Sequence, residues 1–185
     1  MTQTLLIRTD GNSQIGTGHV MRCLTLAQAW HQIGGTVRFV GSDIPNGLRD
    51  RIDEWSQGID FLNLARGSQE DAAQTAAIAG EYDAEWIIVD GPHFDTDYLT
   101  ELTSGDSRVL LIDDIGERSH YDTDLVLNQN LHADPEMYVN RDPDGTTAWS
   151  GLRAVQERVP KMERLVAGPH TDAGDVAHHA RRERS

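Results

Sequence analysis

Short apolar segments alternate with amphipathic segments along the first 130 residues of the chain. Several apolar segments, Trp86–Val89 among them, contain no polar residue, which is typical of strands buried on both faces of a parallel sheet. The intervening segments repeat apolar residues every three or four positions and therefore predict helices. The predicted strands are Leu5–Ile7, Thr36–Val40, Ile59–Leu64, Trp86–Val89, Arg108–Ile112 and Leu125–Leu127, and the predicted helices are His19–Trp30, Leu48–Trp55, Glu70–Ala79 and Asp97–Leu102. This alternation predicts an α/β fold with a Rossmann-like parallel sheet covered by helices on both faces.

A glycine-containing loop joins the first predicted strand to the first predicted helix. Gly16 and Gly18 let the backbone turn tightly and approach a ligand closely, and the helix start directs free N–H groups at that ligand. His19 lies at the helix start, and imidazole exchanges a proton near neutral pH. The loop lacks the third glycine of the dinucleotide fingerprint, which Met21 replaces, and the chain has no P-loop lysine motif. The residues alone leave two interpretations open, an oxyanion-binding loop and a structural turn.

Polar residues follow four of the predicted strands. They are Asp10 after the first strand, Asp90, His93 and Asp95 after the fourth, Asp113 and Asp114 after the fifth, and Asn128, Gln129 and Asn130 after the sixth. Ligands of open parallel sheets bind beyond the carboxyl ends of the strands. Each group taken alone could cap a helix or form a turn, but four groups at one sheet edge favour a binding site.

Four segments of the chain resemble a known enzyme family. The longest is Arg8-Thr-Asp-Gly-Asn-Ser-Gln-Ile-Gly-Thr-Gly-His-Val-Met-Arg-Cys-Leu-Thr-Leu-Ala27. It is similar to the opening of the UDP-2,4-diacetamido-2,4,6-trideoxy-β-L-altropyranose hydrolases of pseudaminic acid biosynthesis, the PseG/SpsG-like family. The segments Val89–Phe94, Ile112–Asp114 and Leu127–Asn130 are similar to further motifs of that family. One departure is Pro92, where the family usually carries a tyrosine whose hydroxyl helps to shape the sugar pocket.

The resemblance implies a fold, a reaction and a set of site residues. The implied fold is the amino-terminal half of a two-domain GT-B glycosyltransferase. The implied reaction is hydrolysis of the bond between the anomeric carbon and the phosphate oxygen of a UDP-sugar, with inversion and without metal or other cofactor. His19 corresponds to the catalytic histidine, expected to act as general base on the attacking water. The implied substrate-binding residues are Asp10, Gly11, Asn12, Gly16, Gly18, Arg22, Asp90, His93, Asp114, Asn128 and Asn130.

Two alternatives to a hydrolase remain. A GT-B glycosyltransferase of polysaccharide biosynthesis would pass the sugar to an acceptor hydroxyl, and its UDP release would require that acceptor. A non-catalytic nucleotide-sugar binding module would bind its ligand without turnover, and His19→Ala would not change the binding.

Composition excludes several other classes of protein. A net charge of −14 argues against a general nucleic-acid binder. No apolar run has transmembrane length and no basic-then-apolar leader is present, so we expect a soluble cytoplasmic protein without a membrane partner. Cys23, the single cysteine, excludes an internal disulfide and is expected to be a buried small hydrophobe. One lysine against 30 Asp and Glu residues fits a halophilic source. The sequence does not predict an oligomeric state.

The character of the chain changes near Gly145. Residues 1–145 carry a net charge of −16, whereas residues 146–185 carry +2 and lose the apolar periodicity. We therefore expect a Rossmann-like domain over 1–145 and an atypical region over 146–185, either a disordered basic tail or linker, or an out-of-frame translation. The three histidines of this region, at 170, 178 and 179, are not expected to form a metal site.

The genetic code supports the out-of-frame interpretation. One permitted set of codons for Ala148–Val155, read from the second base, translates as Leu-Gly-Pro-Ala-Tyr-Ala-Leu, which is similar to the continuation of the family. We hypothesise a shifted frame near 145–148 and expect the isolated chain to be inactive or nearly so, because half of the catalytic cleft is absent. Resequencing codons 140 to 160 and about a kilobase beyond tests this hypothesis. The hypothesis is refuted if the downstream DNA encodes no homologous second half in a shifted frame.

Overall fold

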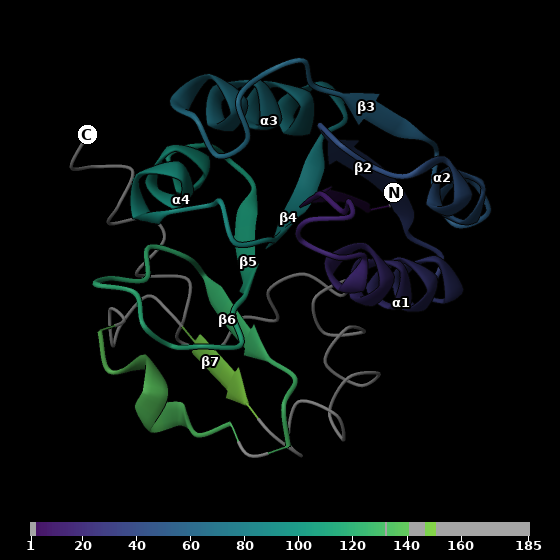
Figure 1. Ribbon diagram of the computed structural model, residues 1–185. Helices are drawn as coiled ribbons and strands as arrows, with labels where there is room; N and C mark the ends of the chain where they lie inside the picture. The colour runs from purple at the N-terminus through teal and green to yellow at the C-terminus, as the bar shows by residue number, and fades with distance from the viewer. Residues whose placement is uncertain (1–2, 132, 141–146, 151–185) are drawn as a thin grey trace.

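The computed structural model describes residues 3–131, 133–140 and 147–150, and they form an α/β fold around one parallel sheet (Figure 1). The strands are β1 Thr4–Thr9, β2 Thr36–Gly41, β3 Ile59–Phe61, β4 Ala84–Asp90, β5 Arg108–Ile112, β6 Leu125–Asn128 and β7 Thr147–Ser150. The helices are α1 Gly18–Gln32, α2 Asn46–Asp53, α3 Gln69–Glu81 and α4 Thr96–Thr103, with the 3₁₀ helix η1 Pro135–Tyr138. The predicted Rossmann-like α/β fold is confirmed.

The strand order of the sheet is β3-β2-β1-β4-β5-β6-β7, and each neighbouring pair is parallel. The chain first runs outward from β1 to β3, then returns to place β4 beside β1 and runs outward in the other direction. The connections after β1 and β4 therefore leave the sheet on opposite sides. The place where the strand order reverses is called a topological switch point. It opens a crevice at the carboxyl ends of β1 and β4, where this class of fold binds its ligands.

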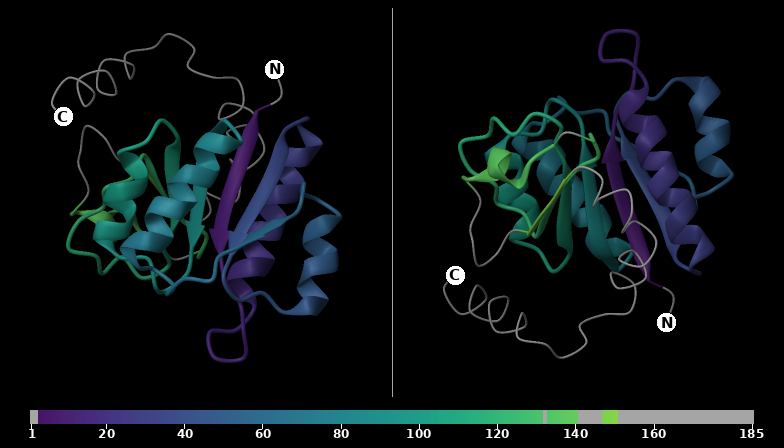
Figure 2. Two further views of the ribbon diagram at one scale, coloured as in Figure 1. Left: turned by 90° about the horizontal axis from the view of Figure 1, so that it is seen from above. Right: turned by 90° about the horizontal axis from the view of Figure 1, so that it is seen from below.

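Helices cover both faces of the sheet, α1 and α2 on one face and α3 and α4 on the other (Figure 2). Successive residues of a strand pack alternately against the helices on one face of the sheet and those on the other. Leu5 and Ile7 pack in the core that contains α1, whereas Leu6 packs in the core that contains α3 and α4. Because both faces are buried, the central strands need apolar residues at nearly every position, which explains the continuous apolar segments of the sequence.

Side-chain caps fix the starts of the helices on the second face. Ser68 accepts a hydrogen bond from the backbone N–H of Asp71 at the start of α3, at 3.2 Å. Asp95 accepts one from the backbone N–H of Tyr98 at the start of α4, at 3.0 Å. The capping interpretation of Asp95 is thereby confirmed, and a cap of this kind typically contributes about 1 kcal/mol.

The structure differs from the prediction at the third strand. We predicted a strand over Ile59–Leu64, but β3 ends at Phe61. Its neighbour β2 ends at Gly41, which pairs with Phe61 and also accepts from the backbone N–H of Leu62, so β2 has no further residue to pair with Asn63 and Leu64. The edge of the sheet is therefore shorter than the apolar run suggested.

The predicted domain boundary falls close to the end of the described chain. The last described segment, β7, lies just beyond Gly145 and pairs with β6 in the same sheet. Residues 141–146 and 151–185, which include most of the predicted atypical region and its three histidines, lie outside the described residues. The boundary and the frame hypothesis both stay predictions. Within the described residues, no helix has both the length and the apolar character needed to cross a bilayer.

Candidate functional site

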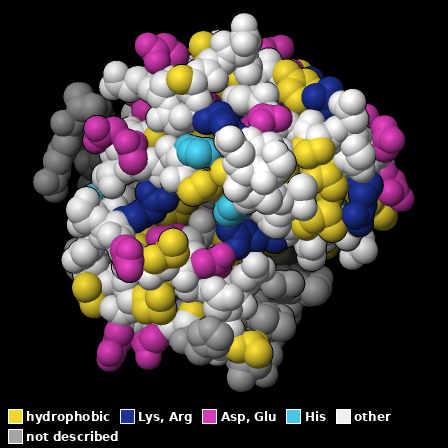
Figure 3. All heavy atoms as spheres, viewed as in Figure 1, with side chains coloured by type: hydrophobic (Ala, Val, Ile, Leu, Met, Phe, Trp, Pro, Cys, Tyr) yellow, Lys and Arg dark blue, Asp and Glu magenta, His cyan; other side chains and the backbone are white. Residues whose placement is uncertain are grey.

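The carboxyl ends of the parallel strands form one face of the molecule, on which histidine and arginine side chains gather near the centre (Figure 3). Asp90 is the last residue of β4 and Asn128 the last of β6, while Asp113 and Asp114 directly follow β5. Asp10 directly follows β1. The expected grouping of polar residues at one sheet edge is therefore present in the structure.

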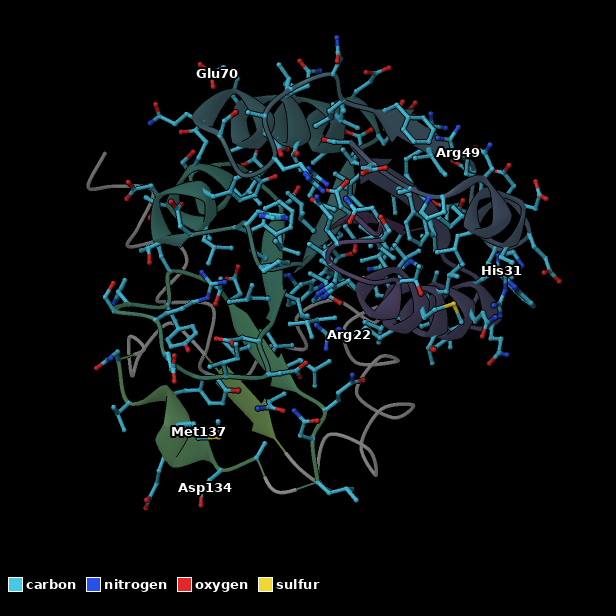
Figure 4. The ribbon with its side chains drawn as sticks, viewed as in Figure 1. Arg22, His31, Arg49, Glu70, Asp134 and Met137 are labelled. Atoms are coloured by element: carbon cyan, nitrogen blue, oxygen red, sulfur yellow. The ribbon has the colours of Figure 1, made fainter. Side chains whose placement is uncertain are left out.

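His19, Arg22 and Asp90 form the centre of this face. Helix α1 begins at Gly18, so His19 and Arg22 lie three residues apart on the same side of its first turn. His19 Nδ1 is 2.8 Å from Asp90 Oδ1. Arg22 donates to both oxygens of Asp90, at 2.5 Å from Nε and 2.6 Å from Nη2, and its Nη1 donates to Asp114. Figure 4 shows Arg22 between α1 and the central strands.

The proton on His19 follows from its two neighbours. Nδ1 lies 2.9 Å from Arg22 Nη2, which can only donate, and 2.8 Å from Asp90 Oδ1, which can only accept. Arg22 Nη2 carries two hydrogens and donates one of them to Asp90. Asp90 is fully buried, and a buried carboxylate binds a charge-assisted donor strongly. We therefore assign the proton to Nδ1, which leaves Nε2 of the neutral ring free to accept a proton.

Burial and charge fix the ionisation of the neighbouring groups. Burial lowers the pKa of Arg22, but its hydrogen bonds and ion pairs with Asp90 and Asp114 outweigh burial and raise that pKa above its ordinary value. Burial and the charge of Asp90 raise the pKa of the Cys23 thiol, whose Sγ lies 3.7 Å from Asp90 Oδ2. Cys23 is therefore a protonated, buried side chain, as the sequence predicted.

A pocket of about 360 Å³ opens beside this group of side chains. Its lining residues are His19, Arg22, Asp90, Gly91, Pro92, Phe94, Asp95, Ile112, Asp113, Asp114, Ile115, Glu117 and Arg118. The carboxylates of Asp90, Asp95, Asp113, Asp114 and Glu117 outnumber the two arginines. The pocket is thus rich in hydrogen-bond acceptors, which suits a ligand that carries hydroxyl or amide hydrogens. No group of His, Cys, Asp and Glu side chains in the described part of the chain is arranged to hold a metal ion.

The glycine loop is organised by its own side chains. Asn12 Oδ1 accepts from the backbone N–H groups of Gln14 and Ile15, at 2.8 and 3.0 Å, and its Nδ2 donates to Asp43 at 2.7 Å. Gly16 has φ +77°, a conformation that glycine adopts without strain. A Cβ on Gly11 would lie 2.9 Å from Val20 Cγ2. These predicted site residues therefore shape the loop, whereas Gly18 lies in open space at the first position of α1.

Two other predicted site residues are buried and bonded internally. Asp10 Oδ1 accepts from the backbone N–H groups of Ser42 and Asp43, and its Oδ2 accepts from Arg8 at 2.7 Å. Asn128 is also fully buried; it donates to Tyr138 Oη at 2.8 Å and accepts from the backbone N–H of Asn130 at 2.9 Å. The structure gives Asp10 and Asn128 contacts within the chain, and Asn130 remains half-buried at the sheet edge.

A buried ion-pair network lies beneath the loops, and the sequence analysis did not identify it. Arg8 is fully buried in β1 and donates to Asp71 of α3 from Nε and Nη2, at 2.9 and 2.7 Å. Its guanidinium also lies 4.9 Å from the ring centroid of Phe94, which lines the pocket. The available signals were an arginine inside an apolar strand and an aspartate in an alanine-rich helix.

The structure does not bring His93 to the pocket beside His19. Its backbone oxygen packs against Gly67 in the loop before α3, and its side chain is not among the pocket-lining groups. Burial lowers the pKa of His93, and the charge of Arg66 lowers it further. His93 therefore belongs to a neighbouring group of side chains.

The strand order and the crevice at the carboxyl edge define a Rossmann-like α/β domain. Among solved structures, the chain is similar to a glycosyltransferase from Rickettsia africae ESF-5, with a TM-score of 0.56 at 11% identity over 80% of this chain and 42% of that chain. It also matches MurG of Acinetobacter baumannii with a TM-score of 0.49 at 12% identity, over 73% of this chain and 43% of that chain.

The chain thus spans less than half the length of these two glycosyltransferases. The predicted fold, one half of a GT-B glycosyltransferase, is confirmed by the likeness to the Rickettsia africae structure. No protein-family model and no curated protein sequence matches the chain. The resemblance to the PseG/SpsG-like hydrolases stays a prediction.

Proposed function

We propose that the chain forms the amino-terminal half of a GT-B enzyme that transfers a sugar from a UDP-sugar to an acceptor hydroxyl. The observation that carries the proposal is the His19–Asp90 pair, 2.8 Å apart at the switch point of a glycosyltransferase-like fold and beside a pocket. A histidine that is hydrogen-bonded to a buried carboxylate through Nδ1 has the arrangement of a general base.

In the proposed reaction, His19 Nε2 accepts the proton of the attacking hydroxyl. The hydroxyl oxygen forms a bond to the anomeric carbon of the sugar, while the bond between that carbon and the phosphate oxygen breaks and UDP leaves. Asp90 holds the imidazole in position and stabilises the positive charge that the ring gains. Arg22 holds the Asp90 carboxylate in place through its two hydrogen bonds.

The pocket offers recognition of an uncharged polar group. Asp114 Oδ2 is bonded to Arg22, but its Oδ1 is buried and has no hydrogen-bond partner among the described residues. A buried acceptor of this kind costs about 1–3 kcal/mol if it stays unpaired. A hydroxyl or amide hydrogen of a bound sugar would satisfy it, which supports a sugar as the occupant of the pocket.

Hydrolysis is the second candidate function, with water in place of the acceptor hydroxyl. The observation that favours it is the convergence of the segments similar to the PseG/SpsG-like family. His19, Asp90 and Asp114, which come from three of these segments, line one pocket. The substrate would then be a UDP-diacetamido-trideoxy sugar of the pseudaminic acid type. Pro92 lines the same pocket at the position where that family usually has tyrosine.

A UDP-release assay distinguishes the candidates. UDP-N-acetylglucosamine and UDP-2,4-diacetamido-2,4,6-trideoxy-β-L-altropyranose are incubated with and without monosaccharide and disaccharide acceptors. The assay uses the 185-residue chain and the gene product with its frame restored near codon 145. We expect UDP release that depends on an acceptor, because the fold is that of glycosyltransferases. Release without an acceptor would instead establish hydrolysis, and binding without any release would establish a non-catalytic module.

A further inference from the structure

A second group of polar side chains lies where four loops meet at the carboxyl edge of the sheet. Asn12 comes from the loop after β1, Asp43 from the loop after β2, Arg66 from the loop before α3 and His93 from the loop after β4. None of these four side chains lines the pocket beside His19. The group thus lies beside the His19–Asp90 site, on the side of β2, without lining its pocket.

Two nitrogen atoms of this group have no hydrogen-bond partner in the part of the chain that the structure describes. They are Arg66 Nη1 and His93 Nε2, and protein atoms cover both. Arg66 Nη1 lies 4.0 Å from Asp43 Oδ2, which is too long for a hydrogen bond, and Asp43 Oδ2 already accepts from Asn12. Arg66 Nη1 can only donate, and His93 Nε2 donates when the ring carries its proton there, so an acceptor bound here would satisfy both.

The backbone holds Arg66 beside His93 by means of Gly67. Gly67 has φ +73°, and a Cβ at this position would lie 2.0 Å from the backbone oxygen of His93. Only glycine lets the loop before α3 pack this closely on the loop after β4. The juxtaposition of the arginine and the histidine is therefore built into the fold.

Arg66 differs from the other arginines of the carboxyl edge in how its charge is paired. Arg8 donates to Asp10 and Asp71, and Arg22 donates to Asp90 and Asp114. Arg118 donates to the backbone oxygen of Phe94 and lies 3.6 Å from Asp113. Among the described residues Arg66 has only the loose contact with Asp43, so its guanidinium can bind another anion.

The charges around the two sites direct an anion to Arg66. Five carboxylates and two arginines line the pocket beside His19, so an anion is less favoured in that pocket than at Arg66. The pKa of His93 is lower than its ordinary value. Burial is the largest cause, followed by the charge of Arg66; Asp10 raises the pKa, but Arg8 and His19 lower it further. An anion bound between Arg66 and His93 would add negative charge and raise the pKa of His93.

We propose that Arg66 and His93 form a binding site for an oxyanion, and that the oxyanion is a phosphate group of a ligand. A guanidinium matches the geometry of phosphate oxygens and binds them through paired N–H donors. The Arg66 side chain is 27% exposed and that of Asp43 is 52% exposed, so a small rotation lets a phosphate replace Asp43 at the guanidinium. The site requires a phosphate and no sugar transfer, so it stands independently of the proposed function.

The test is a titration of the full 185-residue chain with pyrophosphate at constant ionic strength, followed by NMR of the histidine rings and the backbone amides. We expect the His93 signals to shift and the pKa of His93 to rise when pyrophosphate binds. Arg66→Gln should weaken pyrophosphate binding at least about tenfold, because one charged hydrogen-bonding partner contributes about 1.5–3 kcal/mol. The matched control is Arg49→Gln on α2, whose Nε donates to the backbone oxygen of Ile44 and not to any of the four side chains of the group (Figure 4).

Equal weakening by Arg66→Gln and Arg49→Gln would overturn the proposal, because it would show only general attraction of an anion. Shifts at His19 without shifts at His93 would overturn it as well. Because the whole chain carries a charge of −14, general attraction of pyrophosphate is small. Competition by UDP, but not by uridine, would identify a nucleotide as the source of the phosphate; no competition by UDP would identify a phosphorylated acceptor or free phosphate. Loss of UDP-sugar turnover with intact pyrophosphate binding would count against the proposed function alone.

Discussion

Asp71→Asn should lower the free energy of unfolding by roughly 3 kcal/mol, the largest effect on stability that we expect from a single polar substitution. Asp71 is fully buried and accepts two hydrogen bonds from Arg8, together with hydrogen bonds from Tyr98 and Thr75. The substitution leaves the buried guanidinium of Arg8 with Asp10 as its remaining carboxylate partner. For a domain of this size the loss corresponds to a decrease in Tm of roughly 6–12 °C.

Urea and thermal unfolding measure this effect, with Asp60→Asn as the matched control. Asp60 pairs with Arg38 at 2.6 Å, but both side chains are partly exposed, so its substitution should cost less than about 1 kcal/mol. If the two variants lose equal stability, burial does not account for the contribution of the Arg8–Asp71 pair to the free energy of unfolding.

The stability difference between the wild type and Asp71→Asn should also depend on pH. Burial raises the pKa of Asp71, but the hydrogen bond and the charge of Arg8 outweigh burial and lower it below its ordinary value. A carboxylate with a lowered pKa in the folded state contributes its full stabilisation above the unfolded pKa of about 3.9 and loses it as the pH falls through the folded pKa. The difference should therefore be constant from about pH 5 to 7 and decrease below about pH 4. A difference that is unchanged in acid would rule out the ion pair as its source.

In the gene product with its frame restored, His19→Ala should lower kcat/KM for UDP-sugar turnover by about 10²–10⁴-fold, the range expected when a general base is removed. Asp90→Asn should cause a loss in the same range although it keeps the imidazole. The asparagine amide can donate to His19 Nδ1, which would move the ring proton to Nε2 and remove the free lone pair at the pocket. The two variants thus test the base and its orientation separately.

Long-range ¹⁵N–¹H spectra of the histidine rings measure the position of the proton directly. We expect the proton of neutral His19 on Nδ1 in the wild type and on Nε2 in Asp90→Asn. The matched control is His31→Ala on the same helix, because His31 lies away from Arg22 and packs edge-on against Trp55 (Figure 4). A rate loss in His31→Ala equal to that of His19→Ala would contradict the assignment, and circular dichroism shows whether each variant folds.

Local sequence patterns determined the elements and the class of the fold. The apolar segments predicted six strands, and all six are present as β1 to β6 because burial on two faces demands apolar residues at successive positions. The prediction that polar residues meet at one edge also holds. Parallel strands all end at the same edge of a sheet, so residues that directly follow them, such as Asp90 and Asp114, are brought together without knowledge of the strand order.

The family resemblance singled out His19 but not the partners that orient it. Asp90, which lies 71 residues from His19, was expected among the substrate-binding residues; in the structure it lines the pocket and is bonded to His19 and Arg22. His93 was expected at the sugar site, yet its side chain lies with Arg66 outside the pocket.

Only the tertiary structure decided which polar residues remain available to a ligand. Asp10 and Asp114 both carry a carboxylate and both follow a strand. The oxygens of Asp10 accept from Arg8 and from two backbone N–H groups, whereas one oxygen of Asp114 has no partner among the described residues. Arg8 pairs with Asp71, which is 63 residues away in the sequence, because β1 lies centrally in the sheet and α3 covers β1. The periodicity of a sequence reports which face of an element is buried, but the hydrogen-bond partner of a buried charge depends on strand order and loop path.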